Sequence, residues 1–292
     1  MTEEVAYVVV SPTRDEEKYL QKTIDSMAGQ SIKPRLWVIV NDGSTDRTGV
    51  IAEKAASEHP WIRVVHRHDR GFRQAGSGVM DAFYAGLELV SNLEWEFLSK
   101  LDADLSFQPA YFEECFNQFR NHPRLGITGG TVCQEVGGRL EPESKVDPAF
   151  HVRGATKIYR RECWEQIDGL IRESGWDTVD ELKANMLGWK TATLPDVGVV
   201  HHRFTGKAYG TWNDWVKGGR SNYIAGYHPL FMTLKCFKRL FNAPYVIGAV
   251  GLFWGYFVSL FQRVPRVPDE ALIRYFQQEQ LNRLLFRKSL WG

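Results

Sequence analysis

Short runs of β-branched and aromatic residues alternate with segments of helical spacing along most of the chain. Apolar runs bounded by turn residues are typical of buried strands, and apolar positions three and four residues apart indicate helices. In the first hundred residues, strands are predicted at 5–11, 36–40, 62–65 and 96–101, with helices between them at 16–29, 46–58 and 75–91. Strands joined by helices pair in parallel, so the pattern predicts an α/β fold with a mostly parallel sheet flanked by helices.

The alternation continues as far as about residue 200. Later strands are predicted at 125–133, 153–159 and 191–200, and later helices at 109–121, 161–168 and 178–188. The stretch MTEEVAYVVV places acidic residues before a short apolar run, so we interpret it as the first strand and not as a signal peptide. A hydrophobic content of 43% in 292 residues is enough for a large core.

The composition changes after about residue 228, which divides the chain into an α/β domain at 1–228 and a helical region, both basic and apolar, at 229–292. Residues 243–261 contain no charged side chain. As a helix this run would be about 28 Å long at ~1.5 Å per residue, just short of the hydrocarbon core of a bilayer. Residues 269–288 then form a candidate amphipathic helix.

The net charge of +1 conceals an uneven distribution. Residues 211–292 contain 11 Lys and Arg against 4 Asp and Glu, whereas residues 1–210 contain 25 against 31. Because the basic segment is interleaved with a long apolar run, it favours an anionic lipid surface over nucleic acid. The four cysteines form no CxxC pair, so a zinc site or disulfide framework is not indicated and a reducing, cytoplasmic setting is expected.

Polar residues directly after apolar runs indicate where a ligand would bind, because ligands of parallel sheets lie beyond the carboxyl ends of the strands. Such segments are SPTRDEE (11–17), NDGSTD (41–46), LDADLS (101–106) and HHR (201–203). Asp102 and Asp104 could hold Mg²⁺ or Mn²⁺ together with a diphosphate, since these cations need only one or two protein carboxylates. The alternative is that they belong to a turn or a helix cap.

The segment after the second strand has a similar pair of interpretations. Ser44, Thr45 and Asp46 are suitable caps for the next helix, and Gly43 suits a tight turn. Capping does not account for Asp42, whose carboxylate could accept a hydrogen bond from the imide of a uracil or from another base.

Taken together, these segments resemble the family 2 glycosyltransferases with the GT-A fold. The resemblance covers roughly residues 5–205. It is carried by SPTRDEE, NDGSTD, RGFRQAGSGVMDAFYAGL at 70–87, LDADLS, and GWDTVDELKANMLGWK at 175–190.

The resemblance implies a role for individual residues. Those that would bind the nucleotide are Pro12, Thr13, Glu16, Asp42, Arg70, Arg73 and Asp102, with Asp42 at the base and Asp102 near the ribose or metal. Asp104 would be the direct ligand of Mn²⁺ or Mg²⁺, and His202 could add a metal ligand. Arg203 and Arg220 would contact the diphosphate or acceptor. For His202 a structural role, and for the segment around Arg220 plain helix packing, are the alternatives.

The family's catalytic base is an aspartate at the start of a helix, 11 residues before a glycine, which here implies Asp177 before Gly188. Trp176 replaces the usual preceding Glu, so Asp180 remains a second candidate as base or support, and Glu181 a third. The alternative is that Asp177 caps the helix with Asp180 as its N3 acid.

The resemblance therefore implies an inverting, metal-assisted transfer of a sugar from a nucleotide-diphospho-sugar, with UDP expected, to a lipid-linked or polysaccharide acceptor. A polyprenyl-phosphate sugar synthase and a non-catalytic nucleotide-sugar-binding protein are the alternatives. The run at 243–261 could span a membrane, lie in its interface or pack against protein. We expect peripheral or monotopic attachment to the cytoplasmic face of the inner membrane, with Gly248, Gly251 and Gly255 allowing close helix contact.

Overall fold

The structure is a computed structural model that describes residues 5–71, 76–144, 147–203, 211–242 and 245–291. Its strands are β1 (Tyr7–Thr13), β2 (Leu36–Asp42), β3 (Ile62–Arg67), β4 (Phe97–Leu101), β5 (Leu105–Phe107), β6 (Leu125–Val136), β7 (Arg139–Pro142), β8 (Thr156–Arg160) and β9 (Lys190–His201). Its helices are α1 (Leu20–Ala28), α2 (Thr48–Glu58), α3 (Ser77–Val90), α4 (Tyr111–Asn121), α5 (Arg161–Ile167), α6 (Trp176–Met186), α7 (Thr211–Ile224), α8 (Pro229–Arg239), α9 (Tyr245–Phe261) and α10 (Glu270–Leu284).

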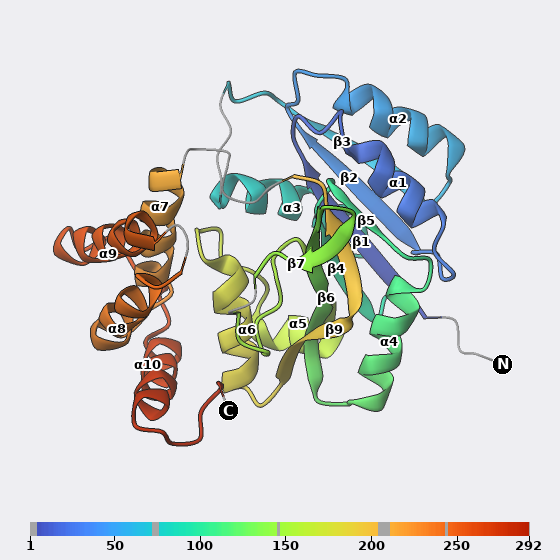
Figure 1. The fold of residues 1–292 in the computed structure, drawn as a ribbon. Coiled ribbons are helices and arrows are strands. Elements are labelled where there is room, and N and C mark those ends of the chain that lie inside the picture. The colour runs from blue at the N-terminus through green and yellow to red at the C-terminus, as the bar shows by residue number, and fades with distance from the viewer. Residues whose placement is uncertain (1–4, 72–75, 145–146, 204–210, 243–244, 292) are drawn as a thin grey trace.

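One sheet organises the molecule, with the strand order β3-β2-β1-β4-β8-β6-β9-β5 and β7 paired to the edge of β6 (Figure 1). The segment β3-β2-β1-β4 is parallel, as the alternation of strands and helices predicts. Beyond β4 the sheet is mixed, because β8 runs antiparallel to both β4 and β6, while β6 and β9 are parallel. The α/β fold is confirmed, and the sheet is parallel in its first half and mixed in its second.

Two short strands, β5 and β7, are absent from the sequence prediction. β5 has three residues and pairs with β9, almost a hundred residues later in the chain. β7 is exposed along its whole length and pairs only with the end of β6. β5 is therefore a strand because of its pairing with a distant segment, whereas β7 is the second arm of a tight hairpin that turns at Gly137 and Gly138.

Helices cover both faces of the sheet because alternate strand residues are buried on each side. Tyr7 and Val9 of β1 pack into a core with α1, α2 and α4. Val8 and Val10 pack into a second core with α3, α5 and α6. Burial on both faces explains why these strands are continuous apolar runs in the sequence.

A third core joins the C-terminal helices to one another and to α6. Its buried members include Leu182 of α6, Met232 of α8, Tyr256 of α9, and Leu272 and Phe276 of α10. The apolar face of the predicted amphipathic helix at 269–288 is thus packed against protein. The amphipathic helix predicted at 269–288 is therefore present as α10, which lies against α6 and α8.

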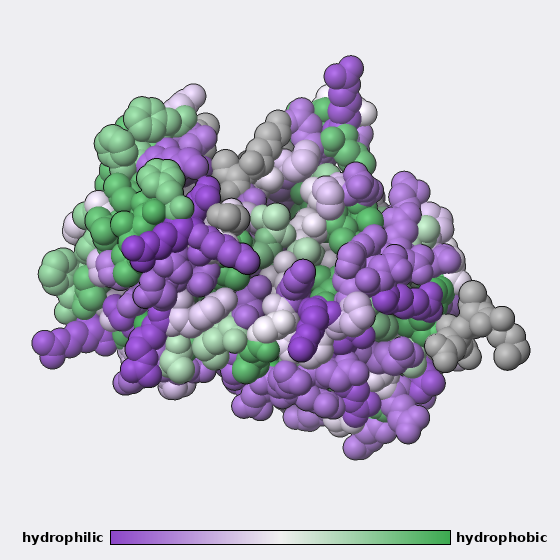
Figure 2. Space-filling model, turned by 90° about the horizontal axis from the view of Figure 1, so that it is seen from below, coloured by the Kyte–Doolittle hydropathy of each residue, from purple (hydrophilic) through white to green (hydrophobic). Residues whose placement is uncertain are grey.

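Apolar side chains remain exposed on α8 and α9. Figure 2 shows green side chains gathered over the end of the molecule that α7 to α10 form, whereas much of the remaining face is purple. Within the described ranges, no helix combines the length and the apolar character that a bilayer crossing requires.

Helices α7 and α9 pack backbone against backbone through glycines. A Cβ atom on Gly219 would lie 2.2 Å from the carbonyl oxygen of Leu252, and one on Gly255 would lie 1.9 Å from that of Val216. Gly251 lies against the side chain of Trp215. The close helix contact that the sequence predicts for the α9 glycines is therefore confirmed, and its partner is α7.

We expect Gly219→Ala to lower the free energy of unfolding by about 1–3 kcal/mol, because its methyl group would overlap the α9 backbone. Gly218→Ala is the matched control, since its Cβ would meet only the end of the Leu252 side chain, at 3.4 Å. That control should be neutral or stabilising, because alanine favours the helical state more than glycine does. Urea unfolding compares the two variants, and equal effects would contradict the close contact.

Candidate active site

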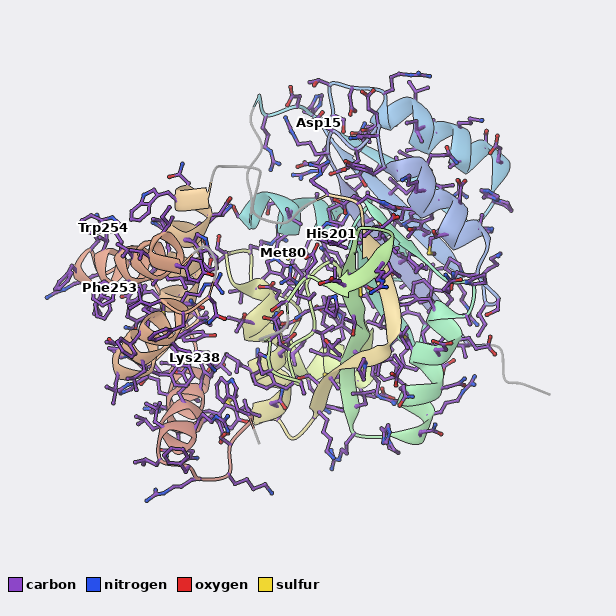
Figure 3. All side chains as sticks on the ribbon, in the orientation of Figure 1. Asp15, Met80, His201, Lys238, Phe253 and Trp254 are labelled. Carbon is purple, nitrogen blue, oxygen red and sulfur yellow. The ribbon has the colours of Figure 1, made fainter. Side chains whose placement is uncertain are left out.

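The loops that follow β1 and β2 are bonded to each other at the carboxyl edge of the sheet. The Asp15 amide donates to the Ser44 hydroxyl at 3.0 Å, and the Thr45 amide donates to the Asp15 carboxylate at 2.9 Å. Asp15, labelled in Figure 3, has a φ of 53°, in the left-handed region that few non-glycine residues adopt. The two loops therefore form one framework.

This framework changes the interpretation of the predicted helix caps. The N-cap residue of α2 is Arg47, and no side-chain bond caps it. Asp46, one residue earlier, accepts a hydrogen bond from the Thr48 amide at 2.9 Å, whereas Ser44 and Thr45 bond to Asp15. None of the three predicted residues is therefore the N-cap, and Asp46 alone bonds to the first residue of α2.

Asp42 ends β2 and is buried among arginine side chains. Its carboxylate accepts hydrogen bonds from Arg67 at 2.7 Å and from Arg70, and Arg14 donates to its backbone carbonyl at 2.7 Å. Burial raises the pKa of Asp42 above its usual value against the opposing effect of the arginines. Asp42 and Arg70, both predicted nucleotide contacts, thus lie together, whereas Arg73 lies outside the described residues.

Pro12, Thr13 and Glu16 lie on the β1 side of this edge, and their polar groups are bonded within the protein. Pro12 is in register with Val40 of β2, and the Thr13 hydroxyl donates to the Ser11 carbonyl at 3.0 Å. The Glu16 carboxylate accepts a hydrogen bond from Arg203. These residues shape the edge of the site, and Arg203 links Glu16 to the segment that follows β9.

Asp102 and Asp104, which follow β4, have different neighbours. The ammonium group of Lys100 donates to the Asp102 carboxylate and to the Gly154 carbonyl, the latter at 2.7 Å. A Cβ on Gly154 would in turn lie 3.3 Å from the Cβ of Asp177. Lys100 therefore connects Asp102 to the backbone against which Asp177 packs.

Asp104 is buried beside two cationic side chains. Its Oδ2 atom lies 3.3 Å from His201 Nε2 and 3.6 Å from Arg203 Nε. The other ring nitrogen of His201 contacts Glu143 at 2.6 Å. Burial alone would lower the pKa of His201, but its bonds to Asp104 and Glu143 outweigh burial and raise the pKa to about 10. His201, labelled in Figure 3, is therefore a cation at neutral pH.

The structure places His201, and not the predicted His202, against the Asp104 carboxylate. The His202 ring lies 2.9 Å from the Ser106 hydroxyl and is stacked on Tyr19, with ring centroids 5.9 Å apart. Neighbouring residues at a strand end face different surroundings, so the sequence cannot distinguish between two adjacent histidines. Arg203, predicted as a diphosphate contact, lies between Asp104 and Glu16.

Asp102 and Asp104 supply the smallest set of protein ligands that suits a divalent cation. Mg²⁺ and Mn²⁺ bind through one or two carboxylates when phosphate oxygens and water complete their coordination. Asp102 and Asp104 are two such carboxylates. In the part of the chain that the structure describes, no group of three or more His, Cys, Asp or Glu side chains is arranged to hold a metal ion. A cation here would therefore need oxygen atoms of the ligand.

Asp177 lies in the first turn of α6 and is partly buried. The N-cap of α6 is Gly175, with a φ of 93°, and no side chain caps the helix. The interpretation of Asp177 as a helix cap is therefore wrong, because the helix begins one residue before it. Among the described contacts, no hydrogen bond or ion pair engages the Asp177 carboxylate, which is available to a ligand.

The other two candidate bases, Asp180 and Glu181, are buried in an ion-pair cluster. The Lys157 ammonium group lies 2.8 Å from a carboxylate oxygen of each. Tyr159 donates to Asp180 at 2.7 Å, and the Val152 amide donates to Glu181 at 2.7 Å. Burial raises the pKa of Asp180 to about 6, although Lys157 opposes this effect. With 2% of its surface exposed, Asp180 cannot reach a substrate and is a supporting residue.

Lys157 holds this cluster against the start of α6. Its ammonium group also donates to the backbone carbonyl of Asp177 at 2.5 Å. The indole ring of Trp176 lies between Lys157 and Lys100, 5.6 Å and 5.1 Å from the two ammonium groups. Trp176, which stands where the family usually has Glu, therefore packs against both Lys100, the partner of Asp102, and Lys157, the partner of Asp180 and Glu181.

His151 gives this cluster a pH dependence. Burial alone would lower the pKa of His151, but Glu181, 2.9 Å from its Nδ1 atom, raises it above the usual value. The protonated ring therefore stabilises the folded state fully below its unfolded pKa of about 6.5, and this contribution is lost as the pH rises through the folded pKa. We expect His151→Gln to remove this part of the decline in stability above pH 6.5, as measured by urea unfolding across pH. An unchanged pH profile would contradict the pairing.

Arg220 lines a cleft between α7 and α9, and no described contact joins it to Asp104 or Asp177. The next residue, Ser221, lies near the start of α6, because a Cβ on Gly175 would lie 3.2 Å from the Ser221 carbonyl oxygen. Trp212 and Trp215 pack against Gly251 of α9. The helix-packing interpretation therefore holds for these tryptophans, and a role of Arg220 at the diphosphate or acceptor stays a prediction.

Several residues of the site are missing from the sequence prediction. Arg67 ends β3 and follows the strand-end rule, so that rule could have identified it. Lys157 lies in β8, whose sequence TKIYR contains two cationic residues in five and so does not indicate that the lysine is buried. Glu143 has no comparable signal, because only the folding of β6, β7 and β9 brings it to His201.

Comparison with known sequences shows which proteins this chain is similar to. The sequence profile of the family described as "Glycosyl transferase family 2" matches residues 8–171. The uncharacterized glycosyltransferase EpsJ of Bacillus subtilis (strain 168) is 29% identical over 99 residues, covering 32% of this chain and 29% of EpsJ. The chain spans less than half the length of the curated relatives it matches.

Solved structures share the fold. The mannosyltransferase PcManGT from Pyrobaculum calidifontis, in complex with GDP-Man and Mn²⁺, has a TM-score of 0.56 and 17% identity, covering 98% of this chain and 89% of PcManGT. S. aureus TarS 1-349, in complex with UDP-GlcNAc, has a TM-score of 0.54 and 19% identity, covering 96% of this chain and 80% of that one. At these identities the likeness shows a common fold.

Proposed function

Because the chain belongs to glycosyl transferase family 2, we propose that it transfers a sugar from a nucleotide-diphospho-sugar to an acceptor hydroxyl with inversion, and that Asp177 is the general base. The observation that carries the proposal is the position of the Asp177 carboxylate. It has no hydrogen-bonding partner among the described residues, whereas the nearby Asp180 and Glu181 are buried in ion pairs. It also packs against Gly154, which Lys100 connects to Asp102.

The chemistry needs few groups from the protein. A carboxylate must accept the proton of the acceptor hydroxyl on the sugar face opposite the leaving nucleoside diphosphate, and Asp177 is suited to this role. Positive charge must stabilise the departing diphosphate, and His201 and Arg203 hold such charge beside Asp104. When bound at Asp102 and Asp104, Mg²⁺ or Mn²⁺ would neutralise further charge on that leaving group.

The nucleotide is proposed to bind over the edge formed by β1, β2 and β4. Asp42 would recognise the base, with Arg70 beside it, and Pro12, Thr13 and Glu16 would shape the pocket. We propose UDP as the nucleotide. The complexes of similar fold contain UDP-GlcNAc in TarS and GDP-Man in PcManGT, so both nucleotides belong in the test.

The acceptor is proposed to be lipid-linked or a growing saccharide. Support comes from the third core, which joins α6, the helix that carries Asp177, to the helices that expose apolar side chains. An acceptor held near a lipid surface would then reach the start of α6 without a large movement of the chain.

Calorimetric binding of UDP-, GDP- and dTDP-sugars with and without Mn²⁺ or Mg²⁺ tests this proposal. We expect one donor to bind more tightly with metal, and Asp104→Asn to abolish that metal dependence, because a neutral amide is a weaker ligand for a hard cation. Asp46→Asn, directly before α2, is the matched control and should retain it. If no nucleotide sugar binds under any metal condition, the glycosyltransferase assignment fails for this chain.

A further inference from the structure

The helices α7, α8 and α9 combine an exposed apolar surface with a basic cleft, and neither feature serves the site at the strand ends. The apolar surface consists of Phe237 of α8, of Phe241, which follows α8, and of Val246, Trp254 and Phe261 of α9, which are 61%, 71%, 61%, 57% and 81% exposed. Exposed aromatic and aliphatic residues at this density are unusual on a protein surface that faces only water.

The ends of α8 and α9 meet, so the apolar residues of the two helices form one continuous surface. Arg239, at the end of α8, lies over the Trp215 ring at 4.2 Å and beside Gly248 of α9. Figure 3 shows Phe253 and Trp254 on the outer side of α9, away from the sheet. The buried side of α9, which contains Gly251 and Gly255, packs on α7. One side of α9 is therefore used by the fold, and the other side has no partner within the described residues.

The cleft opens between α7 and α9 and has a volume of about 280 Å³. Its polar lining consists of Asn213, Lys217 and Arg220 of α7, Ser259 of α9, and Gln262, which follows α9. Trp254 also lines it, and this same residue belongs to the exposed apolar surface. Two cationic side chains thus face a cleft whose wall continues into an apolar surface.

The charges of this region match an anionic surface. Between residues 229 and 266 there are five basic residues and no acidic ones, namely Lys235, Lys238, Arg239, Arg263 and Arg266. The only acid of α7, Asp214, lies in its first turn and is not part of the cleft lining. A protein partner would need an apolar and acidic surface of matching shape, whereas an anionic bilayer offers both properties over any area. Aromatic residues such as Trp254 are favoured at the level of the lipid headgroups.

We propose that α8 and α9 dock on the anionic cytoplasmic leaflet of a membrane, and that Lys217 and Arg220 bind an anionic lipid headgroup in the α7–α9 cleft. The aromatic side chains enter the interface between headgroups and acyl chains, and the flanking basic residues contact lipid phosphates. Under this proposal Arg220 binds a lipid headgroup, in place of the contact with the diphosphate or acceptor that the resemblance implies. The proposal is independent of the glycosyl-transfer chemistry.

Cosedimentation of the full chain with vesicles tests the proposal, using phosphatidylcholine alone and phosphatidylcholine mixed with phosphatidylglycerol. We expect binding to the mixed vesicles and weak or no binding to the neutral ones. Lys217→Gln with Arg220→Gln should weaken binding to the mixed vesicles about tenfold or more. Phe237→Ser with Phe241→Ser should reduce binding to background. These four side chains lie on the surface or in the cleft, so the fold should persist.

A matched control removes the same charge from the opposite end of the molecule. Lys54→Gln with Arg63→Gln, on exposed positions of α2 and β3, should bind mixed vesicles like the wild type. If the control and the cleft variant weaken vesicle binding equally, the loss is due to net charge alone, and the proposed headgroup site is overturned. Absence of wild-type binding to mixed vesicles would overturn the whole proposal, as would a dimer that Phe237→Ser with Phe241→Ser dissociates. Inorganic phosphate binding to the cleft without vesicle binding would assign the cleft to a soluble anion and also overturn it.

Discussion

Asp177→Asn is expected to bind the sugar donor as the wild type does and to lose turnover by about 10²–10⁴-fold, the usual contribution of a positioned general base. The amide has almost the same size but cannot accept the proton of the acceptor hydroxyl. Because no described hydrogen bond or ion pair depends on the Asp177 side chain, the free energy of unfolding should change by no more than about 1 kcal/mol, from the lost interaction with the helix dipole. Donor binding by calorimetry and initial rates of sugar transfer measure the two effects separately.

The control for this variant must remove a negative charge from the first turn of a helix, since such a charge interacts with the helix dipole by about 0.3–1 kcal/mol. Glu114→Gln meets this requirement on α4, where Glu114 is exposed in the first turn. Its turnover should equal that of the wild type. If Asp177→Asn retains turnover within a few-fold of the wild type, Asp177 is not the base.

Lys157→Met is expected to lower the free energy of unfolding by about 3–5 kcal/mol, the usual effect of removing one partner from a buried ion pair. Lys157 is completely buried and neutralises both Asp180 and Glu181. Without it, two carboxylates would remain in a site from which water is excluded. Denaturant unfolding at neutral pH measures the loss.

The same variant should lose less stability at acidic pH. Burial already raises the pKa of Asp180 to about 6 although Lys157 opposes this effect, so loss of Lys157 should raise it further, and protonation of this carboxyl at acidic pH would remove one of the unpaired charges. Lys54→Met is the matched control, because Lys54 pairs with Glu58 on the exposed surface of α2 at 3.7 Å. Its effect should be within about 1 kcal/mol. A loss for Lys157→Met no greater than for this control would contradict the role of the buried cluster.

Much of the first half of the fold can be predicted from the sequence, because both faces of its sheet are buried. Burial on both sides produces continuous apolar runs, and the runs at 36–40 and 62–65 lie within the observed β2 and β3. The polar residues that follow these runs mark the edge where a ligand would bind. The second half of the sheet is less predictable, because β5 has only three residues and depends on pairing with β9, and because β7 is a short, exposed strand without an apolar run.

Some residues of the candidate site can likewise be predicted from the sequence, whereas others cannot. Asp42, Asp104 and Asp177 can be identified from the sequence because strand ends and helix starts are local features. Their partners cannot, since His201 and Glu143 reach Asp104 only through the pairing of β9 with β5 and β6. The choice between Asp177 and Asp180 also depends on tertiary structure, because two carboxylates one turn apart on a helix differ only in what packs over them.

Local sequence patterns are enough to predict the alternation of strands and helices, the order of the polar segments at the strand ends, and the separation of a basic, apolar C-terminal region. Each of these is set by the residue types within about ten positions. The burial of Asp180 under Lys157, the contact of His201 rather than His202 with Asp104, and the packing of α10 on protein while α8 and α9 expose apolar side chains all arise from tertiary packing. Burial and ion pairing depend on which distant segments pack together, and no local pattern records this.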